Sequence, residues 1–284
     1  MGTVTPVDEY AGTITFPDNG DDLEAPDVEA VIQILANRGK HLLDATAGLA
    51  VWGWKLRVAP GGAASGNTGV FVPMIEALNL LSGTSRYAER LSGETQLTTA
   101  DHFGGGTLAN STWYYVYAKI SASALALEIS LDAPEAGLVW KGGAGGTHRY
   151  IGCFRTDSSG VPIPMQMARG RYHWSVSDIG ATALRVLTAG ASGSYADVSL
   201  ASLVPPHAKV VQINAYLDPA GTAGGAAMRK DGAAGAGTVS LSCGSSVAVD
   251  KTFEIECSAT QVVEYRITSG ASTVLYLDVL GFSE

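Results

Sequence analysis

The second half of the chain is a succession of short segments in which apolar and polar residues alternate, separated by turn-forming residues. Successive side chains of a β-strand point to opposite faces, so alternation over about 4–8 residues is typical of half-buried strands. From residue 171 these segments are RYHWSVS, LRVLTA, YADVSLA, KVVQINAYL, AAMRK, TVSLSC, KTFEIEC, VVEYRIT and TVLYLDVLGF. This succession predicts an antiparallel C-terminal β-sandwich, jelly-roll-like, over 171–284.

The preceding part of the chain shows the same pattern less regularly and predicts a middle β domain over 49–170. Segment 73–83 fits a strand or a helix; we favour a strand because proline and Ser-Gly bracket it closely. Residues 149–167 predict a hairpin with its turn at Asp157–Gly160, and the stretch from 86 to 106 reads as irregular. The strands expected here are 49–59, 70–72, 73–83, 111–121 and 125–131.

The N-terminal region carries the strongest helical pattern, in residues 27–43. Its apolar stripe steps by three and four residues, which is heptad spacing, and consists of Val28, Ile32, Leu35, Gly39 and Leu42. A helix of this length is marginal alone and needs a partner. Two interpretations remain: docking on its own domain, or a short parallel bundle between subunits. We favour the bundle, which makes residues 1–48 an attachment arm with a trimerising helix.

Charge and cysteine content narrow the function classes. The formal net charge is -9 and only 16% of residues are charged, which disfavours nucleic-acid binding and fits a surface partly covered by other copies. The three cysteines show no metal-ligand or disulfide-framework spacing, so we expect free buried thiols, with a Cys243–Cys257 disulfide as the alternative. Neither a signal-peptide pattern nor an apolar run of membrane-spanning length occurs, so we expect cytoplasmic folding and no membrane insertion.

Motifs that carry catalysis or hold cofactors are missing from the sequence. Nucleophile-elbow, zinc-protease and phosphate-loop patterns do not occur, and the histidines lack ligand spacing. His148 and His173 flank the predicted hairpin, where a shared metal is the minor interpretation. The acidic loop of Asp18, Asp21, Asp22 and Glu24 lacks the EF-hand pattern and reads as a solvated turn. We therefore expect no enzyme activity, no catalytic residue, no metal site and no cofactor.

The stretch NSTWYYVYAKI at 110–120 concentrates aromatic residues on one predicted strand. Alternation places Trp113, Tyr115 and Tyr117 on one face and Tyr114 on the other, so both faces are apolar. A strand that is apolar on both faces is usually buried on both. We favour a core or subunit interface for these rings over the alternative, a ligand platform.

The order of several motifs resembles virion proteins of tailed bacteriophages, of the tail-fibre or receptor-binding type. The motifs are NSTWYYVYAKI, YIGCFRTDSSGVPIPMQM, GRYHWSV, VSLASLVPPHAKVVQINAYL and a final TVLYLDVLGF strand, and together they cover residues 105–284. Such proteins are β-rich homotrimers that attach to the particle by their N-termini, and their distal domains often touch the host surface.

The resemblance implies a role in attachment and scaffolding, in the tail of a virion assembled in the host cytoplasm. The implied partners are two further copies of this chain, other tail or baseplate proteins through the N-terminal arm, and a host-surface glycan or protein. It marks no receptor-contact residue. Alternatives are a capsid fibre, decoration or baseplate component without receptor contact, a small surface-glycan depolymerase, and a cellular lectin-like adhesin, which the missing export signal disfavours.

Overall fold

A computed structural model describes most of the chain from residue 56 onwards. The described ranges are 56–58, 67–72, 75–82, 85–91, 94–103, 105–122, 124–135, 141, 147–168, 170–175, 181–233 and 238–284. The helix predicted at 27–43, with Val28, Ile32, Leu35 and Leu42, lies outside these ranges, as do the acidic loop and the boundary proposed at residue 48. The described part is mainly β, with several antiparallel sheets.

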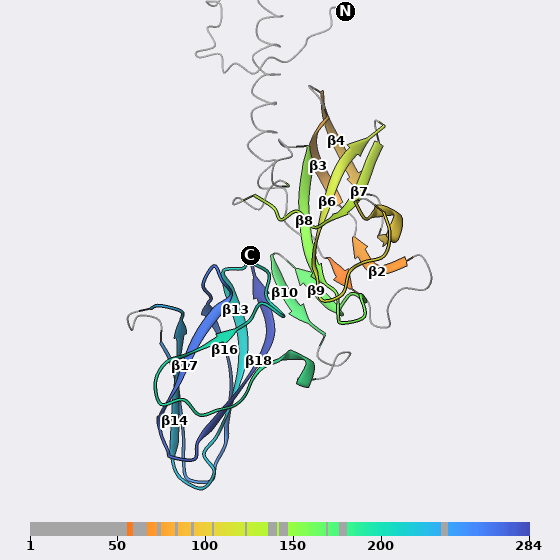
Figure 1. The fold of residues 1–284 in the computed structure, drawn as a ribbon. Coiled ribbons are helices and arrows are strands. Elements are labelled where there is room, and N and C mark those ends of the chain that lie inside the picture. The colour runs from red at the N-terminus through yellow and green to blue at the C-terminus, as the bar shows by residue number, and fades with distance from the viewer. Residues whose placement is uncertain are drawn as a thin grey trace, which may run out of the picture.

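The longest sheet contains nine strands drawn from both halves of the described chain (Figure 1). Eight of them follow the order β16-β13-β18-β10-β9-β1-β2-β5, and β11 pairs with β18 beside β10. Their bounds are β1 (Arg57–Val58), β2 (Asn67–Val72), β5 (Thr95–Thr98), β9 (Met165–Ala168), β10 (Arg171–Trp174), β11 (Arg185–Gly190), β13 (Val210–Asp218), β16 (Val249–Glu256) and β18 (Val274–Ser283).

Three smaller sheets and two short 3-10 helices complete the described fold. One sheet has the order β7-β6-β8, a second is the β3–β4 hairpin, and the third has the order β12-β17-β14-β15. Their bounds are β3 (Ile75–Ser82), β4 (Ser85–Leu91), β6 (Trp113–Ser121), β7 (Ala124–Ser130), β8 (His148–Arg155), β12 (Ala196–Ser199), β14 (Gly224–Lys230), β15 (Val239–Cys243) and β17 (Val262–Ser269), with η1 (Thr99–Asp101) and η2 (Ala181–Leu184).

The nine segments predicted as strands from residue 171 are strands β10 to β18. Segment 73–83 contains strand β3, as favoured. The irregular reading of 86–106 was wrong: it holds most of β4, which pairs with β3, and all of β5, which pairs with β2. Charged residues at 86, 89 and 90 interrupt the alternation there, whereas pairing with a neighbouring strand supplies the hydrogen bonds that make the segment extended.

The hairpin predicted at 149–167 exists only at its tip. Asp157 accepts a hydrogen bond from the Gly160 backbone N–H (3.2 Å) and donates one to the Val161 carbonyl (2.8 Å). Beyond the tip, β8 pairs with β6, whereas β9 pairs with β1 and β10. The two arms stay paired as far as Ile163, whose N–H donates to the Arg155 carbonyl at 2.7 Å, and then separate; the Pro164 carbonyl already accepts from the Ser175 N–H at 3.0 Å, on the β10 side.

Two sheets face each other in the C-terminal part, with strands β13, β16 and β18 opposite β14, β15 and β17 (Figure 1). Strand β13 alternates strictly, so that every second side chain is buried. The side chains that β13 and β18 bury, and those that the opposite sheet buries, belong to one apolar cluster. Members from this region include Val211, Ile213, Leu217, Leu275, Leu277, Met228, Leu241 and Val263.

The long sheet is continuous across residue 170, where the sequence placed a domain boundary. Gly170 forms the turn between β9 and β10, and β10 then pairs with the end of β18. The Tyr172 and Phe282 rings stack there with centroids 4.4 Å apart. Because Gly281 has no side chain, β18 approaches β10 so closely that a Cβ at this position would lie 2.1 Å from the Tyr172 carbonyl oxygen.

This close approach predicts that Gly281→Ala destabilises the protein. The added methyl group must push β10 away from β18, and overpacking of this kind typically costs about 1–3 kcal/mol. Chemical denaturation of the purified chain measures the effect. Gly193→Ala is the matched control, because a Cβ at Gly193 meets no atom within 4 Å. Equal stability of the two variants would contradict the close approach.

Candidate functional site

The outer face of the long sheet carries aromatic and polar side chains over β16, β13, β18 and β11, most of them exposed or half-buried and Asp278 buried. We call this surface the outer face and define it by Tyr216, Asn214 and Gln212 of β13, Asp250, Thr252 and Glu254 of β16, Tyr276 and Asp278 of β18, and Arg185 of β11. The alternation of β13 fixes the arrangement, since its other side chains are buried in the sandwich.

Two tyrosines lie side by side at one end of the outer face. Tyr216 and Tyr276 are directly opposite each other in the β13–β18 ladder, and their ring centroids are 5.9 Å apart. Tyr216 is exposed, with 38% of its surface accessible to solvent. The Arg185 guanidinium lies 5.1 Å from the Tyr276 ring centroid, within cation–π range. The two tyrosine rings therefore form an apolar surface on top of the sheet, and the pairing of β13 with β18 fixes their positions.

Hydrogen-bonding groups occupy the next row of the same face. Asn214 is opposite Thr252 on one side and Asp278 on the other, and the Thr252 hydroxyl donates to the Asn214 amide oxygen at 3.0 Å. Arg185 donates two hydrogen bonds to Asp278, Nε to Oδ1 at 2.9 Å and Nη2 to Oδ2 at 3.1 Å. This bidentate contact raises the pKa of Arg185 and fixes both side chains beside the tyrosines.

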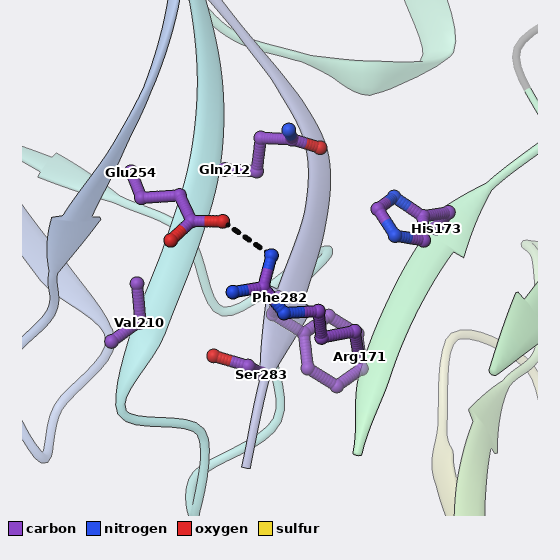
Figure 2. Close-up of a pocket in the computed structure, with 7 residues that line it drawn as sticks. All are labelled: Arg171, His173, Val210, Gln212, Glu254, Phe282 and Ser283. Carbon is purple, nitrogen blue, oxygen red and sulfur yellow. Dashed lines mark hydrogen bonds and ion pairs between the residues drawn. The ribbon is translucent and has the colours of Figure 1, made fainter. Parts of the chain in front are cut away.

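A small hollow continues the outer face toward β10 (Figure 2). Gln212 and His173 are the two ladder partners of Gly281, one on each side of it, and both line the hollow. Arg171 closes the hollow with an ion pair to Glu254, Nη1 to Oε1 at 2.8 Å. The volume of the hollow is about 10 Å³, which is room for roughly one water molecule. The hollow is thus a dimple in a broad surface and not a deep substrate pocket.

The aromatic stretch predicted from sequence lies elsewhere, on β6 in the centre of its sheet. Tyr114, Tyr115 and Tyr117 are buried, and Trp113 is half-buried. Trp113 lies 6.1 Å from Trp174 and 5.8 Å from Phe282 by ring centroids, so it contacts the C-terminal strands. The described structure therefore places these rings within one chain and not on an open ligand platform.

Two buried tyrosines of this stretch, Tyr114 and Tyr117, have partners for their hydroxyl groups. Tyr117 donates to the Asp132 carbonyl oxygen at 2.7 Å, and the Tyr114 hydroxyl accepts from the Ala109 N–H at 2.7 Å. Burial, and then the neighbouring acidic groups, raise the pKa of Tyr115 and Tyr117 well above the usual tyrosine value. Both hydroxyls are therefore neutral at physiological pH.

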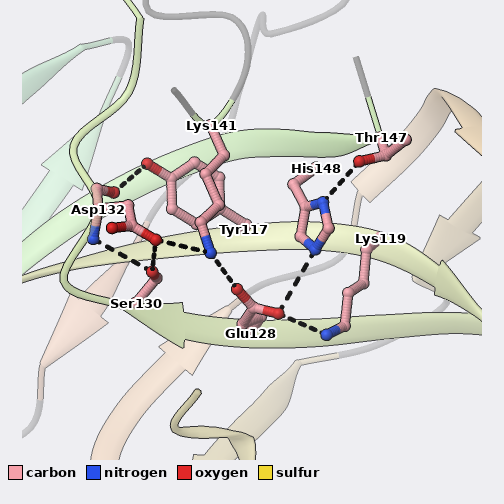
Figure 3. A network of polar contacts seen from close by, with 8 residues as sticks. All are labelled: Tyr117, Lys119, Glu128, Ser130, Asp132, Lys141, Thr147 and His148. Atoms are coloured by element: carbon pink, nitrogen blue, oxygen red, sulfur yellow. Dashed lines mark hydrogen bonds and ion pairs between the residues drawn. The ribbon is translucent and has the colours of Figure 1, made fainter. Parts of the chain in front are cut away.

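A second polar cluster lies on the three-stranded sheet around Glu128, which is only 2% exposed (Figure 3). Lys119 and Lys141 both donate to its carboxylate, Lys141 at 2.8 Å, and Lys141 also pairs with Asp132 at 3.1 Å. His148 approaches Glu128 with its Nε2 atom at 3.5 Å. The charges of the two carboxylates, Glu128 and Asp132, are balanced by the two lysine ammonium groups, so the cluster is neutral overall. We interpret it as a structural ion-pair network.

The pKa shifts in this cluster follow from its contacts. Burial by itself raises the pKa of Glu128, but the hydrogen bonds from Lys119 and Lys141 outweigh it, and the pKa lies below its usual value. Burial lowers the pKa of His148, with Glu128 opposing, so the imidazole is neutral at physiological pH. Glu128 therefore stays ionised and engaged with its cations.

The remaining sequence expectations can be placed on the described fold. Cys153, Cys243 and Cys257 are free and buried, so no disulfide joins the last two. His148 lies on β8 and His173 on β10, in different sheets. Within the described residues, no helix has the length and apolarity needed to cross a membrane.

Comparison of the sequence with protein-family models and with curated proteins found no match.

The sequence analysis did not identify the outer face. Its two tyrosines, Tyr216 and Tyr276, are 60 positions apart, and each lies in a segment with an ordinary strand pattern. The one sequence feature that could have indicated this face is Tyr216 in KVVQINAYL, an aromatic residue at a position where the alternation of the strand calls for a polar one.

The Glu128 cluster predicts a pH-dependent stability effect for Lys141→Met. Loss of one ammonium leaves a buried carboxylate with fewer partners, and we expect a loss of about 1–3 kcal/mol at neutral pH. The folded-state pKa of Glu128 is lowered, so the contribution is complete above the unfolded pKa and disappears as pH falls through the folded pKa. The difference between wild type and variant should therefore shrink in acid, as urea denaturation at neutral and acidic pH would show.

Lys230→Met provides the matched control, since it removes an exposed pair with Glu256 whose side chains are 45% and 69% accessible. Exposed pairs contribute about 0–1 kcal/mol, so this variant should be nearly as stable as wild type. A Lys141→Met effect as small as the control, or one that grows in acid, would refute the role given to the cluster.

Proposed function

We propose that this chain is a non-enzymatic structural protein of a tailed-bacteriophage virion, of the tail-fibre or receptor-binding type. The sequence support is the order of motifs over 105–284 that resembles such proteins. The structure supports the proposal only at the level of fold class: the described part is an all-β, sandwich-like fold, which is compatible with such a protein.

The outer face is the observation that carries the binding part of this proposal. Saccharides have apolar C–H faces that pack on aromatic rings, and rims of hydroxyl groups that need donors and acceptors. Tyr216 and Tyr276 supply the first kind of contact, and Asn214, Thr252 and Arg185 supply the second within one or two rows of the ladder. We therefore assign a bacterial surface glycan as the ligand class of the outer face.

The proposal includes no catalytic step. Of the carboxylates considered for hydrolysis, Asp278 is held by Arg185 and Glu264 by Arg229, whereas Asp218 accepts a hydrogen bond from the Ala220 N–H. A flat face that binds weakly is suited to adhesion when several copies act together, because linked sites raise the overall affinity without new contacts.

Several copies per particle follow from the proposed homotrimer, which rests on the heptad-spaced stripe at 28–42. We predict that light scattering of the purified full chain gives three times the chain mass of 29.3 kDa. Ile32→Asp combined with Leu35→Asp should yield monomers, because two charges enter the apolar stripe. A trimeric double variant would exclude this stripe as the trimerising element.

The function is tested with the purified full chain on the bacterium that supports growth of the particles and on an array of bacterial surface glycans. Tyr216→Ala with Tyr276→Ala should weaken binding at least about tenfold, or about 1.4 kcal/mol. Antibodies against the chain should label the tails of intact particles.

Tyr195→Ala is the matched control, because Tyr195 packs against Arg229 and Arg266, at the other sheet. Equal loss of binding in control and double variant would overturn the assignment of the outer face. Tail labelling without any cell or glycan binding would instead support a tail or baseplate component that lacks receptor contact, and labelled heads would support a capsid fibre or decoration.

A further inference from the structure

Three side chains of metal-binding type meet at the seam between the three-stranded sheet and the C-terminal strands. They are Cys153 on β8, His207 in the turn before β13, and Glu284 directly after β18. One ligand atom from each lies within 4.8 Å of the other two. Sequence reasoning expected no metal site, because these residues are separated by more than 50 positions and form no spaced motif.

The group is enclosed by protein. Cys153 is fully buried, and the side chains of His207 and Glu284 are 11% and 6% exposed. The Tyr150 hydroxyl also reaches the site and donates to Glu284 Oε1 at 2.5 Å. Among the described residues, the basic group that contacts the Glu284 carboxylate is His207.

The sulfur-to-oxygen distance of the group matches a tetrahedral zinc centre, whereas its nitrogen-to-oxygen distance is shorter. With Zn–S near ~2.3 Å and Zn–O and Zn–N near ~2.1 Å, tetrahedral geometry separates sulfur from oxygen by ~3.6 Å and nitrogen from oxygen by ~3.4 Å. Cys153 Sγ lies 3.6 Å from Glu284 Oε1. His207 Nε2 lies 2.5 Å from the same oxygen, so the imidazole needs to withdraw by roughly 1 Å to reach the ideal spacing.

The surroundings allow both the movement and the entry of an ion. His207 lies in a turn closed by the Ala208 N–H bonding to the Pro205 carbonyl at 3.1 Å, and not in a strand ladder. It also lines a surface groove of about 500 Å³ together with Lys209 and Glu256. An ion entering from this groove meets His207 before the buried cysteine.

Charge balance favours a divalent, thiophilic cation. A thiolate and a carboxylate neutralise two positive charges, so the occupied site carries no net charge into the buried seam. Sulfur, imidazole and carboxylate ligands together are a typical zinc set. On binding, the Cys153 thiol proton leaves to solvent, and the His207 proton resides on Nδ1 while Nε2 donates its lone pair to the metal.

We propose that Cys153, His207 and Glu284 form a zinc site that ties β8 to the C-terminal end of β18, with the Tyr150 hydroxyl or a water in the fourth position. Its role is structural, because it links residues 77 and 131 positions apart across the seam. The proposal is independent of glycan binding at the outer face.

The test uses full-length chain without a histidine tag, stripped with a chelator and then dialysed against zinc. We expect one zinc per chain by elemental analysis, a rise of the melting temperature on adding zinc, and a sulfur-to-metal charge-transfer band with cobalt. Loss of an outer-shell partner already costs about 10–100-fold in metal affinity, so loss of a ligand in Cys153→Ala or His207→Ala should cost at least about 100-fold.

Two matched controls separate this site from other groups. Cys257→Ala removes a different buried thiol, and Asp197→Asn alters an exposed acidic cluster, so both should bind zinc as wild type does. Glu284→Gln keeps the shape and a hydrogen-bond acceptor, so it tests the ligand if the cysteine variant fails to fold. No zinc binding by wild type, undiminished binding in His207→Ala and Glu284→Gln, or loss of binding in Cys257→Ala would each overturn the proposal.

Discussion

The pairing of β10 with β18 is the constraint on which the rest of the described structure depends. It joins strands from the middle of the chain to the C-terminal sandwich in one sheet, so neither part ends where the sequence changes pattern at residue 170. Gly281 permits the close approach of the two strands, and the Tyr172–Phe282 stack fills the space beneath them. Gln212 and His173, the ladder partners of this glycine, line the hollow on the outer face.

The aromatic stretch on β6 consolidates this junction from the other side. Trp113 reaches across to Trp174 and Phe282, and its indole N–H donates to the Ala201 carbonyl at 3.3 Å. Tyr115 packs near His207, with ring centroids 5.5 Å apart, so the stretch also borders the proposed zinc site. The most aromatic segment of the chain thus stabilises contacts between sheets, and ligand recognition is assigned to a sparser surface.

Much of the fold could be predicted from period-two alternation, because strand formation is a local consequence of which side chains must be buried. The prediction succeeded for the strands from β10 onwards and for β3. It failed at β4, where charged residues interrupt the pattern, and at β5, which is short and has Leu97 as its one apolar residue. It also failed to pair β8 and β9 correctly: the turn at Asp157–Gly160 was right, but the choice of neighbouring strand depends on packing far away in the sequence.

The sequence by itself determined that this chain is mainly β, where most of its strands lie, and that its cysteines form no disulfide framework. Tertiary structure alone decided which side chains share a surface. Tyr216 meets Tyr276 through the β13–β18 register, and Cys153 meets His207 and Glu284 at a seam between sheets. The physical reason is that alternation assigns each residue to a face, whereas strand order and register, which follow from the packing of the whole chain, assign its neighbours.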